Sequence, residues 1–260
     1  MSKEEYLITD APLKALTVFA MPMILGSFFQ QVYNMADSII VGQFVGSSAL
    51  AAVGACAALT NVFICVALGA GVGAGVLVSR YFGAREYGKM KTIVSTSLIS
   101  FLVLSILLGV FGFCFSHGMM SGLQTPADIL EEAVLYLRVY FVGFPFLFMY
   151  NILSTMFTSI GESKIPLGLL IFSSILNIGM DLWMVAGLGL GVFGAALATL
   201  IAQGISAVLS LLIFLYRMRR YQSTFAWFDG RELRSMLQIA VPSVLQQSTV
   251  SIGMMIVQAV

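Results

Sequence analysis

Residues 15–45 read ALTVFAMPMILGSFFQQVYNMADSIIVGQFV, an apolar stretch without Lys or Arg in which Asp37 is the one acidic residue. A membrane-spanning helix needs about 20 mostly apolar residues, so this stretch is long enough to cross a bilayer. A charge at the bilayer centre costs roughly 2.5–3.5 kcal/mol on insertion scales, and such residues typically mark an ion or substrate pathway. A second carboxylate, Asp181, lies in a similar stretch. These two aspartates are the first candidates for functional residues.

The composition of the whole chain agrees with that opening stretch. The 260 residues are 59% hydrophobic and 10% charged, and the mean hydropathy is +0.98. The apolar runs are too long for barrel strands, and in lipid only helices otherwise satisfy their own backbone groups. The sequence therefore predicts an all-α polytopic membrane protein. Seven helices are expected, over 13–45, 49–79, 92–116, 133–159, 166–186, 192–216 and 236–260.

These helices divide the chain into regions. We expect a cytoplasmic N-terminal tail over 1–12, a six-helix transmembrane lobe over 13–216, a cytoplasmic linker over 217–235 and the start of a second lobe over 236–260. The first residues lack a basic n-region and a cleavage site, so no removable signal peptide is predicted.

A weak internal repeat suggests that the seventh helix copies the first. At an offset of 220 residues, Pro22 matches Pro242 in the similar stretches AMPMIL and AVPSVL. Six crossings return the chain to its starting side, as in parallel-repeat transporters. Because the chain also stops inside an apolar run, we interpret it as the N-terminal half of a longer protein that lacks its C-terminal lobe. Asp37 faces Val257 at this offset, so cation coupling should reside in the first lobe alone.

The basic residues predict the orientation. With the N-terminus in the cytoplasm, Arg138 is the one Lys or Arg among 13 that falls outside. This asymmetry predicts a multi-pass protein of the cytoplasmic membrane with a cytoplasmic N-terminus.

Several other functions find no support in the sequence. The arginines form no array suited to nucleic acid, and the three cysteines lack metal-ligand spacing. The Gly189, Gly191 and Gly194 pattern in GLGVFG lacks the strand that a dinucleotide site needs, so we expect a tight outer turn. With one histidine, His117, and no catalytic cluster, we expect neither an enzyme nor a bound cofactor.

Four oxygen-bearing side chains are expected at similar depth in the outer half of the bundle. At 1.5 Å per helical residue, Asp37, Asp181 and Thr199 lie about 14, 9 and 8 Å from the outer ends of their helices. Asn177 lies one turn deeper than Asp181 on the same face. Such a set can hold a proton or a hard cation such as Na⁺. Ordinary interhelical hydrogen bonding remains the alternative interpretation.

The first helix carries further candidates. Gln30 and Asn34 form a polar stripe with Asp37, and Gln30 and Tyr33 suit the wall of a substrate pathway. Pro22 removes a backbone donor, which makes it either a bending point or a static kink. In the second helix, GAGVGAG (69–75) has the small-xxx-small spacing of closely packed helices.

Three stretches carry a resemblance to a known family. These are PMILGSFFQQVYNMADSIIVGQFVGSSALAAVG (22–54), SRYFGARE (79–86) and NIGMDLWMVAGLGLGVFGAALAT (177–199). The chain resembles multidrug and toxic compound extrusion (MATE) transporters, in particular their DinF-like branch.

The resemblance implies half of a twelve-helix, two-lobe antiporter. Such a protein exports cationic or amphipathic organic compounds in exchange for H⁺ or Na⁺. It also implies a cation site at Asp37, Asn177, Asp181 and Thr199, and coupled bending at Pro22.

Two alternatives differ in what they require. A lipid-linked saccharide flippase can share this architecture, but its anionic substrate calls for a cationic cavity, and these spans carry two acids instead. A membrane-embedded enzyme would need a catalytic cluster near the interface, which the sequence lacks.

Overall fold

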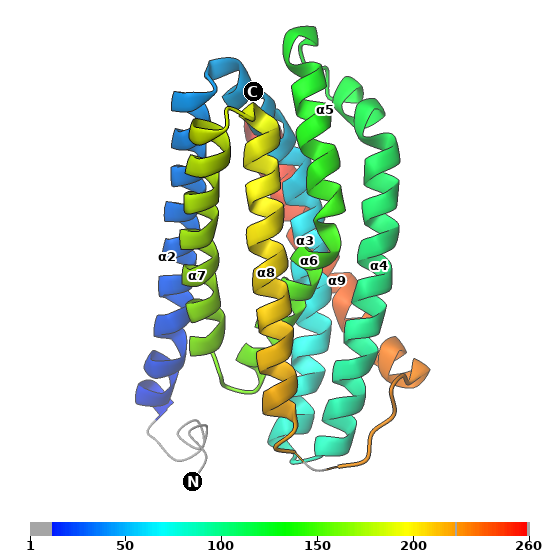
Figure 1. The fold of residues 1–260 in the computed structure, drawn as a ribbon. Helices are drawn as coiled ribbons and strands as arrows, with labels where there is room; N and C mark the ends of the chain where they lie inside the picture. Colours follow the sequence, from blue (N-terminus) through cyan, green and yellow to red (C-terminus); the bar gives the residue numbers. More distant parts are fainter. Residues whose placement is uncertain (1–11, 222, 259–260) are drawn as a thin grey trace.

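The fold is an all-helical bundle, seen here in a computed structural model that describes residues 12–221 and 223–258. Long helices lie side by side, with the short connections at the two ends (Figure 1). The described helices are α2 (Pro12–Phe44), α3 (Ser47–Gly83), α4 (Tyr87–Gly122), α5 (Ala127–Val142), α6 (Phe144–Ser159), α7 (Lys164–Asp181), the π-helix η1 (Leu182–Gly187), α8 (Gly191–Met218) and α9 (Gly230–Gln258).

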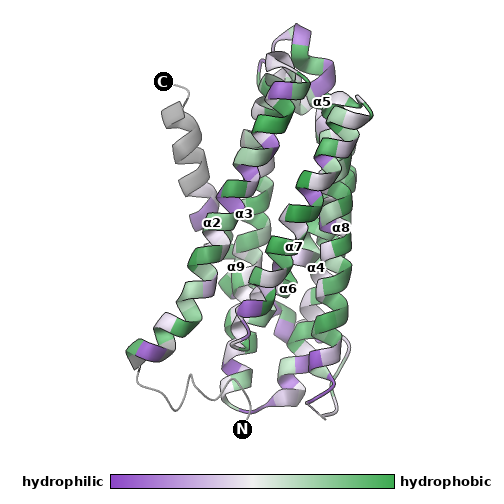
Figure 2. Cartoon of the chain, turned by 60° about the vertical axis from the view of Figure 1, so that its left-hand side comes forward, coloured by the Kyte–Doolittle hydropathy of each residue, from purple (hydrophilic) through white to green (hydrophobic). Residues whose placement is uncertain are grey.

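Five of these helices are long and apolar enough to cross a membrane, and α5 with α6 would make a sixth crossing as one bent span. Hydrophobic residues dominate the middle of the helices, whereas hydrophilic residues gather toward the ends (Figure 2). Large apolar side chains such as Leu107 and Leu212 are exposed on the outside of the bundle. This is the surface that lipid covers in a multi-pass membrane protein, so the predicted fold class is confirmed.

The span expected over 133–159 is not one straight helix. It consists of α5 and α6, which are bent by 52° relative to each other at Gly143. Pro145 lies in the first turn of α6. There its missing N–H costs no hydrogen bond, because the first N–H groups of a helix have no partner within the helix. The uninterrupted apolar run FVGFPFLF concealed this break.

Two expected boundaries also differ near the end of the chain. The linker expected over 217–235 is shorter, because α8 continues to Met218 and α9 begins at Gly230. The seventh span expected over 236–260 lies within α9, but the described part of α9 is not among the membrane-spanning candidates. The polar run QQST (246–249) lowers its hydropathy. The tail expected over 1–12 lies outside the described residues, apart from Pro12.

Four glycines on α3 let two other helices approach its backbone. A Cβ on Gly69 would lie 2.6 Å from the Cα of Val244 in α9, and one on Gly73 would lie 2.6 Å from a carbonyl oxygen in α9. A Cβ on Gly71 or on Gly75 would lie 3.2 Å or 2.8 Å from the side chain of Thr155 in α6. The predicted small-xxx-small packing is therefore present on two faces, with one glycine pair for each neighbour.

The segment between α8 and α9, residues 219–229, is fastened to the end of α4. Thr92 Oγ1 accepts a hydrogen bond from Ala226 N, and Thr96 Oγ1 accepts one from Asp229 N, both at 3.1 Å. Ser95 Oγ lies 3.1 Å from Ala226 O, to which it donates. These three hydroxyls share one face of α4 and satisfy backbone groups of the linker. Figure 1 shows the linker running beside the lower end of α4.

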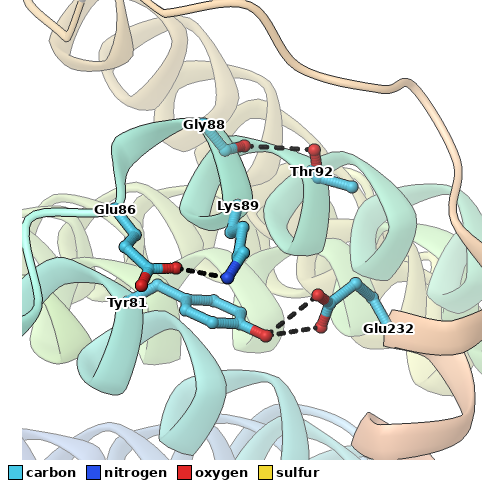
Figure 3. Close-up of polar contacts among 6 residues, drawn as sticks. All are labelled: Tyr81, Glu86, Gly88, Lys89, Thr92 and Glu232. Carbon is cyan, nitrogen blue, oxygen red and sulfur yellow. Dashed lines mark hydrogen bonds and ion pairs between the residues drawn. The ribbon is translucent and has the colours of Figure 1, made fainter.

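A second set of polar contacts joins the ends of α3 and α9 nearby (Figure 3). The Tyr81 hydroxyl donates to the Glu232 carboxylate, at 2.9 and 3.0 Å from its two oxygens. Lys89 pairs with Glu86 at 2.6 Å and lies 5.7 Å from the centre of the Tyr81 ring. The start of α9 is thus held by α3 as well as by the linker on α4.

Replacing both Thr92 and Thr96 by Val should release the linker from α4. Each change removes the acceptor of a backbone N–H, which costs about 1–3 kcal/mol when the donor stays buried. Limited trypsin digestion should then cleave faster after Arg219 and Arg220. The control is Thr158→Val, because Thr158 donates only to carbonyls of its own helix. Equal cleavage of the double variant and the control would show that these bonds do not hold the linker.

Candidate functional site

Three helices bring the predicted polar residues together. Asp37 comes from α2, Asn177 and Asp181 from α7, and Thr199 from α8. A short connection folds α8 back against α7, with Gly189 and Gly191 at φ values of 65° and 56°. Glycine adopts this left-handed conformation at no steric cost because it has no Cβ, so the GLGVFG stretch forms the expected tight turn. The π-helix η1 follows Asp181 directly, and π-helical turns are frequent at functional sites.

Asn177 connects α7 to α8 by hydrogen bonds. In the amide orientation that satisfies both of its polar atoms, Nδ2 donates to Asp181 Oδ2 at 2.8 Å. Its Oδ1 then accepts from Thr199 Oγ1 at 3.3 Å and from Thr199 N at 3.2 Å. Asn177 and Asp181 are almost fully buried, with 1% and 0% of their surface exposed. The amide therefore fixes one oxygen of a buried carboxyl group.

The two aspartates meet across the interface between α2 and α7. Their carboxyl groups are joined by a side-chain hydrogen bond. An ionised carboxylate only accepts hydrogen bonds, so the two carboxyl groups can bond each other only when one of them carries a proton. Asp37 Oδ1 and Asp181 Oδ1 are buried and find no hydrogen-bond partner among the described residues. These free oxygens, with the neutral oxygens of Asn177 and Thr199, fit a proton or a small hard cation.

Three tyrosines complete the surroundings, and two of them were missed in the sequence. Tyr33 of α2 hydrogen-bonds Thr199, which places it beside the cation ligands rather than only along a substrate path. Tyr136 of α5 lies close enough to interact electrostatically with Asp37 and Tyr33. The hydroxyl of Tyr140, one turn further along α5, is buried without a partner among the described residues. Their spacing of four residues on one helix was the signal that could have been noticed.

The other candidates on α2 lie apart from this carboxyl cluster. Gln30 and Asn34 are exposed, and Gln30 Nε2 donates to Asn34 Oδ1 at 3.4 Å along the helix. Asn34 in turn donates to Gln31 at 3.4 Å. Pro22 lies inside α2, buried and more than three turns from Asp37. Gln30 and Asn34 are thus available on the open face of α2.

The space beside the carboxyl cluster is small. A cavity of about 10 Å³ adjoins it, lined in part by Tyr140, Thr199 and Gln203. This is close to the minimum for one water molecule, whereas pockets for drug-sized molecules measure about 300–1,000 Å³. The cluster can therefore serve an ion or a proton, but an organic substrate needs another place.

The fold and this site define a class of protein: a multi-pass helical membrane protein with a buried pair of carboxyl groups. The MatE family model matches residues 22–183. The chain therefore belongs to the MatE family, the multidrug and toxic compound extrusion transporters.

Individual relatives agree with this family. The chain is 28% identical to the probable multidrug resistance protein YoeA of Bacillus subtilis, over 97% of this chain and 58% of YoeA. It is also 28% identical to the multidrug export protein MepA of Staphylococcus haemolyticus, over 80% of this chain and 46% of MepA. A crystal structure of MATE in the bent conformation superposes with a TM-score of 0.88, at 28% identity, over 98% of this chain and 57% of the other. The chain thus spans about half the length of the relatives that it matches.

Proposed function

We propose that this protein is a cation-coupled antiporter that exports cationic or amphipathic organic compounds, and that the chain forms the first lobe of a two-lobe transporter. The observation that carries the proposal is the pair of hydrogen-bonded carboxyl groups, Asp37 and Asp181, inside an apolar bundle. The relative MepA, named as a multidrug export protein, supports the direction of transport. The coupling ion is H⁺ or Na⁺.

The proposed mechanism is charge neutralisation. Two ionised carboxylates at this distance repel each other strongly where water is scarce, and each is costly to bury. A proton shared by the pair, or Na⁺ held by Asp37, Asn177, Asp181 and Thr199, removes most of that cost. The occupied site therefore favours the arrangement in which α2 lies against α7. Emptying the site favours the separation of α2 from α7. The cation therefore binds the two arrangements with different affinity, and this difference lets a cation gradient drive a conformational cycle.

In this mechanism α2 is the moving part. It packs mainly against α7, and only 6% of its most apolar 18-residue stretch is buried. Pro22 leaves one carbonyl of α2 without its helical partner, which lowers the cost of bending there. The substrate would contact the exposed face of α2, where Gln30 and Asn34 offer polar groups among apolar side chains. The end of the bundle that is rich in Lys and Arg faces the cytoplasm.

The proposal is tested in everted membrane vesicles from cells that express the gene for this protein. Uptake of a fluorescent organic cation is followed while a pH gradient or a Na⁺ gradient is imposed alone. We expect uptake with one of the two gradients and its collapse when that gradient is dissipated. Vesicles without the protein are the control. Uptake that is the same with and without either gradient would rule out cation coupling.

A further inference from the structure

A groove far from the carboxyl cluster lies between α4, α8 and the linker. It has a volume of about 360 Å³, more than thirty times that of the cavity beside Thr199. Apolar side chains form its inner wall, including Val94, Leu98 and Phe214. The linker residues Phe225 and Trp227 form its outer wall, where the hydroxyls of α4 fasten the linker. The hydrogen bonds that fasten Ala226 to α4 therefore also hold the outer wall of the groove in place.

Two cations line the same groove, Lys91 on α4 and Arg219 at the end of α8. No acidic side chain among the described residues pairs with either of them. Two other cations at this end of the bundle do have acidic partners, since Arg217 pairs with Glu162 at 3.2 Å and Lys89 with Glu86. Lys91 instead lies 5.6 Å from the centre of the Phe225 ring. The groove is thus an apolar space with two positive charges that no acidic side chain in the described part of the chain neutralises.

The groove is continuous with the surface that faces lipid. Ile99 and Leu215 line it and are 40% and 49% exposed. One turn further along the same helices, Val103 and Leu212 are also exposed. Trp227 of the linker is 74% exposed, and Trp is enriched at membrane–water interfaces. A molecule in the groove could therefore place an apolar chain against α4 and α8 and an anionic group beside the two cations.

We propose that this groove is a binding site for an anionic phospholipid. Lys91 and Arg219 hold the phosphate, and the first part of an acyl chain lies along Leu98, Ile99 and Leu215. Arg suits phosphate because its planar fork donates two parallel hydrogen bonds, and Lys adds a point charge. The site does not depend on the transport mechanism above. The orientation proposed there only assigns the lipid to the cytoplasmic leaflet, where anionic lipids attract basic residues.

The site is tested by native mass spectrometry of the purified chain with phosphatidylglycerol and with phosphatidylcholine of the same acyl chains. Each cation near an anionic lipid surface is worth about a fivefold preference, so we expect phosphatidylglycerol to be retained at least about tenfold better. The double variant Lys91→Gln, Arg219→Gln should retain both lipids equally. The charge-conserving variant Lys91→Arg, Arg219→Lys should keep the preference, which separates a charge effect from misfolding.

The matched control removes two exposed cations from the same end of the bundle, in Lys164→Gln, Arg234→Gln, and should keep the preference. An equal loss in this control would mean that general surface charge attracts the lipid, and would overturn the site. Equal retention of the two lipids by the unmodified chain would overturn it as well. Displacement of phosphatidylglycerol by inorganic phosphate at the same concentration would show that the groove takes a soluble anion instead of a lipid.

Discussion

Gradient-driven export should fall to background when Asp181 is replaced by Asn. The amide has nearly the same shape and can still hydrogen-bond Asn177, but it neither releases a proton nor offers a charged oxygen to Na⁺. Coupling between two ligands corresponds to factors of about 5–150, so we expect initial export rates to drop on the order of 10- to 100-fold. The measurement is the gradient-dependent uptake of an organic cation into everted vesicles, normalised to the amount of protein.

The same assay contains its controls. Asp37→Asn should have a similar effect, and the double variant should be no worse than either single variant, because the two groups share one proton. Asp128→Asn removes an exposed carboxylate in the first turn of α5 and should leave export unchanged. If Asp181→Asn retained full export, the carboxyl pair would be a structural hydrogen bond, as the alternative interpretation of the sequence holds.

The largest effect on stability should come from Gly73→Ala. A methyl group there would lie 2.6 Å from the carbonyl oxygen of Met236 and 2.8 Å from the Cβ of Ala240, so α9 must move away from α3. Overpacking of this kind costs about 1–3 kcal/mol, and a clash with backbone lies at the upper end. We expect a lower melting temperature for the purified chain in detergent. It is measured by the loss of the monodisperse peak in size-exclusion chromatography after heating.

The control for this experiment is the same substitution at Gly54, which also lies in α3. A Cβ at Gly54 meets nothing within 4 Å, and Ala is favoured over Gly in a helix by about 1 kcal/mol. Gly54→Ala should therefore be neutral or slightly stabilising. Equal melting temperatures for the two variants would mean that α9 does not depend on the close approach at Gly73.

The sequence predicted the position of the carboxyl cluster because polar and charged side chains are energetically costly inside apolar membrane helices. Asp37, Asp181 and Asn177 are conspicuous in apolar helices, and helical spacing was enough to place them at one depth. Tyr136 and Tyr140 were missed because tyrosine is both apolar and polar, so its presence in a membrane helix attracts no notice. The roles of these residues in ion coupling stay predictions.

The parts that could not be predicted depend on contacts between distant residues. Thr92 and Thr96 look like ordinary helix residues, and nothing in their neighbours shows that they accept hydrogen bonds from Ala226 and Asp229. The bend between α5 and α6 was concealed because hydropathy does not register where a glycine and a proline fall within an apolar run. The GAGVGAG pattern predicted close packing, but only the fold shows that α9 uses one face of it and α6 the other.

The fastened linker also bears on how force passes between the two proposed lobes. A free tether of eleven residues would let a second lobe diffuse and would transmit no torque. Residues 219–229 are bonded to α4 by three hydroxyls instead, so they act as a short strut that anchors the base of α9. Beyond this anchor, Ala240 and Val244 of α9 are packed on Gly73 and Gly69 of α3, on both sides of Pro242. A relative rotation of the two proposed lobes must therefore carry this part of α9 along with the first lobe.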